Sequence, residues 1–336
     1  MSQDILKKEV KSGAIRNIYL FYGEEDYLKE VYCKRIEDII LDDALKDLNK
    51  IVLQEEKDIS KIIDICETMP CFSEKKLVIL KNSSFFKASK KEGKNKKEDL
   101  EMLVKNVPPY TCLIFCESEV DKRLKIVKDI DKKGLVVEFG LQPVNVLVKW
   151  IAGELKKKGK VITVATATKL IEYSEASMFA IENEINKLCL YVGDRQEITD
   201  KDIDDVCIKP INVRIFDLID NIAMQNEDKA LKNLKEMLIL KEPVPRIMFM
   251  IIKHIKQLLE MKTLLKEGVI QRDCVSIMKI APYTATKLSR QIGKFEEKKL
   301  KAILKEMLEL DYKVKIGEIK DILAVEIIIT KLCQNN

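Results

Sequence analysis

A chain of 336 residues is long enough for two or three domains, each with its own core. Charged residues make up 34% of it, and no uninterrupted apolar run of about 18 residues occurs, which excludes a membrane-spanning helix. The net charge of +5 is small against 60 basic and 55 acidic residues, so it permits contact with nucleic acid without requiring it.

The N-terminus and the cysteines indicate the cellular compartment. The stretch MSQDILKKEVKSG has neither the apolar region nor the cleavage site of a signal peptide, so we expect a cytoplasmic protein without a membrane partner. Nine cysteines without a repeated C-x-x-C pattern are expected to be reduced thiols. Cys112 and Cys116 fall on one face of a predicted strand, which favours core positions over metal ligation.

Five short apolar runs rich in strand-forming residues occur before residue 140. Segments with helical periodicity, such as 26–41 and 58–69, separate them. Runs without strict alternation are typical of strands that are covered on both faces, and intervening helices imply a mostly parallel sheet. The sequence therefore predicts an α/β domain with strands at 18–22, 51–53, 77–80, 112–116 and 135–139.

The turn after the first strand lies where a phosphate-binding loop would be found. A working loop has the pattern G-x-x-x-x-G-K-[ST], in which backbone N–H groups and the lysine bind phosphate. Here Gly23 is followed by Glu24, Glu25 and Asp26, with no second glycine at the required spacing and no Gly-Lys-Ser/Thr sequence anywhere. Three carboxylates in the first helical turn would satisfy the helix dipole and repel a triphosphate. We expect a degenerate P-loop that has lost its lysine and binds no nucleotide or other cofactor.

The segment from Lys87 to Asp99 is rich in lysine and has no apolar periodicity. Such lysines can contact DNA phosphates. Runs of lysine also occur on many solvated surfaces, so a mobile, solvated loop is the favoured interpretation.

From residue 143 the pattern is helical and no strand is expected. The last of several short helices has Thr199 as its cap and Asp202 in its first turn. Pro210 then opens another helical section, whose apolar faces must pack on one another or on partner subunits. We therefore expect an α/β domain over 1–142 followed by two all-α domains over 143–209 and 210–336.

The chain has a single histidine, His254, which restricts the catalytic chemistry available. Histidine-based triads are removed unless this residue carries them, and no histidine-based zinc site is left. His254 falls on the apolar stripe of a helix, so we interpret it as a packed core residue. The stripe comprises Ile247, Ile251, His254, Leu258, Met261 and Leu265. We therefore expect no catalytic residues and no metal site.

The order of these segments resembles the delta subunit of the bacterial DNA polymerase III clamp loader. The likeness rests on YLFYGEEDYL after the first strand, TMPCFSEKKLVIL later in the first domain and ENEINKLCLYVG in the second. The likeness continues in the third section and covers about residues 16 to 333 in all. The matching segments there are IFDLIDNIA, IMFMIIKHIKQLL, PYTATKL and LDYKVKIGEIKDILAVEIII. The resemblance implies an AAA+-like α/β domain, a helical lid and a helical collar.

The same resemblance implies a function. Members of this family belong to the DNA polymerase III holoenzyme, a nucleotidyltransferase complex, and we expect this chain to have no enzymatic activity of its own and not to hydrolyse ATP. It would bind the sliding clamp (beta) and open or hold open one clamp interface for loading onto primed DNA. Its other partners would be the ATPase subunits (gamma or tau) and delta prime, with the collar holding the loader together.

The family contacts the clamp through an apolar plug in the loop before the third strand. By similarity the plug corresponds here to Met69, Pro70, Cys71 and Phe72. Independently, Pro70 ends a helical pattern, so Phe72 falls in a connector, where side chains are normally exposed. The alternative is that Phe72 folds back on its own sheet. Many relatives carry a larger apolar residue at the position of Cys71, so we expect Phe72 to dominate the contact.

Three other functions stay open on the sequence. An active NTPase of the same architecture would bind ATP saturably. A nucleic-acid-binding module that uses residues 87–97 would bind DNA tightly without partners and with a steep salt dependence. A helical scaffold of another assembly would not retain the sliding clamp.

Overall fold

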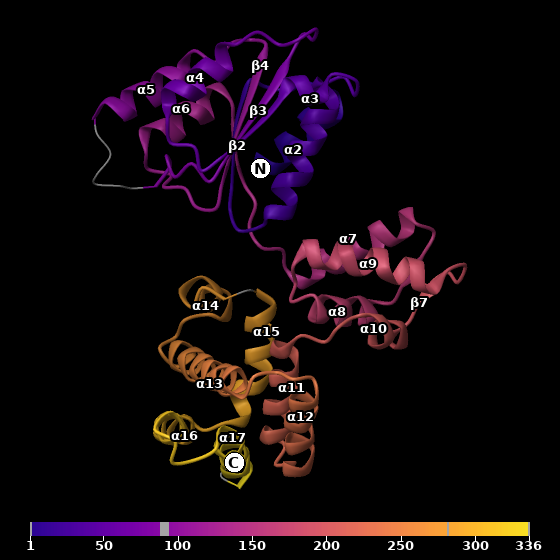
Figure 1. Cartoon of the computed structure of the whole chain (residues 1–336), viewed down its shortest axis with the longest axis vertical. Helices are drawn as coiled ribbons and strands as arrows, with labels where there is room; N and C mark the ends of the chain where they lie inside the picture. The colour runs from indigo at the N-terminus through magenta and orange to yellow at the C-terminus, as the bar shows by residue number, and fades with distance from the viewer. Residues whose placement is uncertain (1, 88–93, 281, 335–336) are drawn as a thin grey trace. The chain divides into compact units, whose positions relative to one another are not determined.

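The computed structural model describes residues 2–87, 94–280 and 282–334 (Figure 1). The chain divides into two compact units, Met1–Leu141 and Gln142–Asn336. The predicted division of the second unit at residues 209 and 210 stays a prediction.

The first unit is built on a five-stranded sheet in the order β2-β3-β4-β1-β5, and every neighbouring pair is parallel. All residues of β1 and β4 are buried, which explains the uninterrupted apolar runs at 18–22 and 112–116. The α/β fold class predicted for this region is confirmed. The strands are β1 (Ile18–Tyr22), β2 (Lys50–Gln54), β3 (Lys76–Lys81), β4 (Thr111–Glu117) and β5 (Leu135–Glu138).

Helices cover both faces of this sheet, and successive residues of β1 point to opposite cores. Tyr19 and Phe21 pack with α1 and α2, whereas Ile18 and Leu20 pack with α4, α5 and α6. The sequence did not predict α1, which contacts β5 and buries Leu6. The helices are α1 (Ser2–Ser12), α2 (Asp26–Ile40), α3 (Lys46–Asn49), α4 (Ile59–Glu67), α5 (Lys94–Lys105) and α6 (Lys125–Lys133).

The lysine-rich segment is only partly a loop. Residues 94–99, predicted as part of a mobile loop, form the first half of α5, so the prediction was wrong for them. Residues 88–93 lie outside the described residues. The apolar positions of α5 that pack on the sheet begin at Leu100, so the lysine-rich half lacks the periodicity that would have marked it as a helix.

The second unit begins with four helices, in line with the predicted helical domain. The capping box between Thr199 and Asp202 is present at the start of α10. The expectation of no strand in this region was wrong, because two-residue strands β6 (Val161–Ile162) and β7 (Glu197–Ile198) form a parallel pair. Two residues are too short for any periodic pattern. The helices are α7 (Val144–Lys157), α8 (Val164–Tyr173), α9 (Met178–Val192) and α10 (Asp200–Val206).

The rest of the second unit is helical around one large apolar core, as predicted. The apolar stripe of α13 is buried from Ile247 to Met261, but Leu265 at its end is 36% exposed, so this position was predicted wrongly. The helix extends beyond the core that covers its apolar stripe. The elements are α11 (Ile211–Ala223), α12 (Glu227–Ile239), α13 (Val244–Lys266), α14 (Gln271–Ile277), α15 (Pro282–Gln291), η1 (Ile292–Lys294), α16 (Glu297–Lys315) and α17 (Asp321–Gln334).

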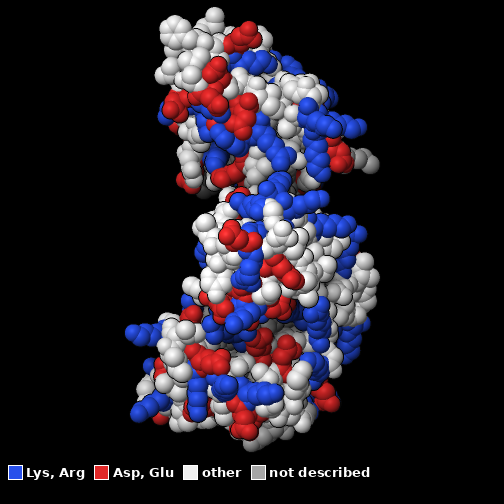
Figure 2. Space-filling model, turned by 90° about the vertical axis from the view of Figure 1, so that its right-hand side faces the viewer, with Lys and Arg blue, Asp and Glu red and all other residues white. Residues whose placement is uncertain are grey.

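The surface carries charges of both signs. On the face drawn in Figure 2, lysine and arginine side chains are interspersed with aspartate and glutamate. None of the helices within the described residues is long and apolar enough to cross a membrane.

Candidate functional site

The turn after β1 is closed by packing against the end of β5. Gly23 has a φ of +119°, and its N–H donates to the carbonyl of Glu117 at 3.1 Å. A Cβ at this position would lie 2.2 Å from the carbonyl oxygen of Phe139. Glycine is therefore required here by the fit of one backbone against another, independently of any phosphate.

The three carboxylates after Gly23 have different surroundings. Asp26 is the first residue of α2 and Glu25 is its N-cap, so the expectation that all three lie in the first helical turn was wrong. Glu24 and Asp26 are exposed, whereas Glu25 is buried and its N–H donates to the carbonyl of Phe139 at 2.9 Å. Burial raises the pKa of the Glu25 carboxyl to about 7.

Lys29 is a residue of this site that the sequence analysis missed. It follows Gly23 at the spacing of the P-loop lysine, with Leu28 in place of the second glycine. Its side chain is buried, and its ammonium donates to the carbonyls of Gly23 at 2.7 Å and Glu117 at 3.0 Å. It also pairs with Asp26 at 2.7 Å. The expected loss of the lysine is therefore corrected, because the lysine is present but its donors are used inside the turn.

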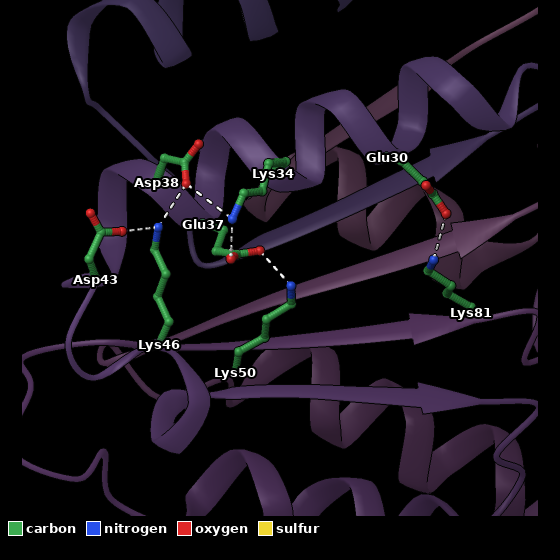
Figure 3. Close-up of polar contacts among 8 residues, drawn as sticks. All are labelled: Glu30, Lys34, Glu37, Asp38, Asp43, Lys46, Lys50 and Lys81. Atoms are coloured by element: carbon green, nitrogen blue, oxygen red, sulfur yellow. Dashed lines mark hydrogen bonds and ion pairs between the residues drawn. The ribbon is translucent and has the colours of Figure 1, made fainter. Parts of the chain in front are cut away.

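The residue at the position of the P-loop serine or threonine also forms an ion pair within the chain. Glu30 stands there, and its carboxylate lies 3.0 Å from the ammonium of Lys81 at the carboxyl end of β3 (Figure 3). A P-loop hydroxyl at this point would serve a magnesium ion. The two charged side chains instead neutralise one another.

The loop between α4 and β3 is anchored at its helical end. Because the last carbonyls of a helix have no partner within it, they need donors from elsewhere. Four successive carbonyls at the end of α4 accept from three side chains of β3, β4 and the residue before β4. Lys76 donates to Ile65 and to Thr68 (2.6 Å), Thr111 to Cys66 (2.7 Å) and Tyr110 to Glu67 (2.6 Å).

The tip of this loop leaves apolar side chains uncovered. Phe72 is 90% exposed, the highest value for a large apolar side chain among the described residues, and Met69 is 73% exposed. Cys71 is exposed and Pro70 is half-buried. Phe72 has a φ of +51°, a conformation that costs a non-glycine residue about 1 kcal/mol or more. Phe72 therefore does not fold back on its own sheet.

His254 is a buried core residue, as predicted. Its Nε2 lies 2.6 Å from Oε1 of Gln291, and its ring packs edge-on against Phe216. Burial lowers the pKa of the imidazole to about 4, so the ring is neutral at physiological pH. Within the residues that the structure describes, no group of three or more His, Cys, Asp or Glu side chains is arranged to hold a metal ion.

Two sequence models decide the family. The model described as "DNA polymerase III, delta subunit" matches residues 19–140, and the model of the C-terminal domain of the same subunit matches residues 212–332. The chain belongs to the DNA polymerase III delta subunit family. The predicted resemblance is thereby confirmed.

Individual members of the family agree with this assignment over the whole chain. The DNA polymerase III subunit delta of Bacillus subtilis is 28% identical, over 98% of this chain and 96% of its own length. The solved structure of the Bacillus subtilis DNA clamp loader delta protein matches with a TM-score of 0.77 and 27% identity, covering all of both chains. A more distant likeness is to the Thermotoga maritima RuvB Holliday junction branch migration motor, with a TM-score of 0.41 and 10% identity over 84% of each chain.

Proposed function

We propose that this delta-family chain is the clamp-binding subunit of a clamp loader, and that it contacts the sliding clamp through Met69, Pro70, Cys71 and Phe72. The observation that carries the proposal is the exposure of Phe72 on a loop whose helical end is fixed by side chains of the sheet. Neighbouring apolar side chains that stay uncovered together, as Met69, Cys71 and Phe72 do, are typical of interaction sites. A solved delta protein of a clamp loader matches along the entire chain, which supports this choice of partner.

The energetics of one phenylalanine are sufficient for a dominant contact. Burying its side chain in a partner pocket is worth about 1.5 to 3 kcal/mol by area. Such aromatic anchors are typical centres of binding energy at interfaces. Contact at the loop would let the chain open, or hold open, one interface of the clamp while the clamp is placed on primed DNA.

We further propose that the chain works in this complex without hydrolysing ATP. Support comes from the charge pairing around Gly23, because Lys29 and Lys81 already have internal partners. The ATPase subunits (gamma or tau) would supply the ATP-dependent steps in a cytoplasmic complex that also contains delta prime, with this chain's C-terminal helices forming part of the collar.

The proposal is tested by titrating labelled clamp with the full chain and with Phe72→Ala. The substitution is expected to weaken clamp binding by about tenfold or more. The buried ring is worth about 1.5 to 3 kcal/mol, and a loss of about 1.4 kcal/mol already corresponds to a factor of ten. Phe249→Ala is the matched control, because Phe249 is also exposed, at 62%, but lies on α13 in the other unit. Equal affinities for the chain and its Phe72→Ala variant would refute the proposal.

A further inference from the structure

Asn49, the last residue of α3, holds the backbone of Cys71 from both sides. Its Oδ1 accepts from the Cys71 N–H at 2.7 Å, and its Nδ2 donates to the Cys71 carbonyl at 2.9 Å. Nδ2 also donates to the carbonyl of Leu45 at 3.2 Å. A single side chain thus satisfies both polar backbone groups of one loop residue, and Asn49 itself is only 2% exposed.

The helix that carries Asn49 is fixed by charged side chains on either side of it. Lys46 bridges Asp38 and Asp43, and Lys50 pairs with Glu37 at 2.6 Å (Figure 3). Exposed ion pairs are individually weak, but pairs that share residues form a network. The residues at the start of α3 and directly after Asn49 are therefore tied to α2, which is itself packed on the sheet.

Fixing Cys71 has a direct consequence for its neighbour. Phe72 has a left-handed backbone and makes little contact with its own domain, as its 90% exposure shows. A strained residue persists only where the surrounding structure determines its conformation. Here the residue before Phe72 is the one whose two backbone groups are bonded, so the bonds to Asn49 select the direction in which the aromatic ring projects.

We propose that Asn49 is a positioning residue for the clamp contact, acting through Phe72; this inference rests on the proposed function. By keeping the loop in its binding conformation before the clamp arrives, Asn49 removes the entropy cost of ordering it at the interface. Asn49 itself makes no contact with the clamp in this account.

The test is a double-mutant cycle measured by titration of labelled sliding clamp with the full chain. Asn49→Ala is expected to weaken binding by about three- to tenfold, the equivalent of one ordered side chain. In the Phe72→Ala background the same change is expected to have no further effect, because Asn49 acts through that ring. Additive losses, or unchanged affinity of a folded Asn49→Ala chain, would overturn the inference. No effect of Phe72→Ala alone would instead refute the proposed function.

Two further variants separate positioning from general destabilisation. Asn17→Ala removes a side chain of the same unit whose Nδ2 donates to the Pro108 carbonyl at 3.1 Å, and it is expected to lower thermal stability without changing clamp affinity. Asn49→Asp keeps the acceptor for the Cys71 N–H but turns a carboxylate oxygen toward the carbonyls of Cys71 and Leu45 in a buried site, so it is expected to weaken clamp binding at least as much as Asn49→Ala. A loss with Asn17→Ala as large as that with Asn49→Ala would contradict positioning.

A measurement on the unchanged chain covers the case in which Asn49→Ala does not fold. The Cys71 amide hydrogen is expected to exchange with solvent more slowly than the Phe72 amide hydrogen. The reason is that the Cys71 N–H donates to Asn49, whereas the Phe72 N–H does not. Equal and fast exchange of both amides would overturn the inference.

Discussion

The turn at Gly23 and the loop at Phe72 lie at opposite edges of one parallel sheet. Gly23 follows the carboxyl end of β1, whereas Phe72 precedes the amino end of β3. Ligands of open α/β sheets bind at the carboxyl edge. In this chain the charged groups at that edge are bonded to one another, and the uncovered apolar groups are at the other edge.

Under the proposed function, a protein-binding loop at one end of the strands would take the place of a phosphate site at the other. A phosphate site needs donors without internal partners, and the donors of Lys29 already bind two carbonyls and a carboxylate. A protein-binding site needs apolar surface that the fold leaves uncovered, and the Phe72 side chain is uncovered. Rigid anchoring is common to both regions. The anchors close the first region and expose the second.

The largest loss of stability is expected from a substitution that disturbs the packing of the turn at Gly23. Gly23→Ala is expected to lower the free energy of unfolding by about 3 kcal/mol or more, because its Cβ would meet the Phe139 carbonyl and its φ is positive. Gly13→Ala is the control, since Gly13 also has a positive φ but no atom within 4 Å of the added Cβ. The change at Gly13 is expected to cost about 1 kcal/mol. Equal losses in urea titrations would mean that the turn is not closely packed.

Removing the internal cation tests whether the turn depends on it. Lys29→Met is expected to cost about 2 to 3 kcal/mol of unfolding free energy, because it leaves the buried Glu117 carbonyl and the part-buried Gly23 carbonyl without their charged donor. Lys34→Met, which removes an exposed lysine of the same helix, is expected to have a much smaller effect. If both variants unfold at the same urea concentration, Lys29 does not hold the turn.

The buried carboxyl of Glu25 predicts a dependence of stability on pH. Its pKa is about 7 in the folded chain and 4.5 as an ordinary value, so the folded state binds the proton more tightly. Wild-type stability should therefore fall as pH rises from about 4.5 to 7. Glu25→Gln removes this loss and is expected to be more stable by about 2 kcal/mol at pH 8, with no difference below pH 4.5. An unchanged difference across that range in urea titrations would show that Glu25 is not buried in solution.

The smallest effect is expected at Cys71, whose thiol is the one exposed among nine. Cys71→Ser is expected to change stability by less than about 0.5 kcal/mol, as for other surface positions. Labelling with a thiol reagent should modify Cys71 first, since burial raises the pKa of Cys66 and Cys112 to about 12. Bound clamp should slow this labelling. Labelling at the same rate with and without clamp would place the contact elsewhere.

The local patterns of the sequence were sufficient for most of the fold. Strands have short apolar runs and core helices have apolar stripes, so β1 to β5 and the packed position of His254 could be predicted, although β2 is not buried. Patterns failed where an element is short or lacks an apolar stripe, as in β6, β7 and the lysine-rich half of α5. The identity of the plug residues came from the family resemblance, and their exposure from their place in a connector.

The site required information that no local pattern contains. Lys29 was not predicted because the P-loop pattern has a glycine at the position of Leu28, although the spacing from Gly23 is intact. The bonds between Asn49 and Cys71 join residues 22 positions apart, and they depend on how α3 meets the loop in space. An asparagine at a helix end is most simply explained as a local cap. Its bonds to a distant loop are visible only in the folded chain.

Amide hydrogen exchange of the full chain, with the clamp or with ATP added, tests the comparison most directly. We expect the clamp to slow exchange across residues 69–75 and millimolar ATP to leave residues 23–30 unchanged. Protection of residues 23–30 by ATP, or no protection of residues 69–75 by the clamp, would contradict a closed turn at one edge of the sheet and a binding loop at the other.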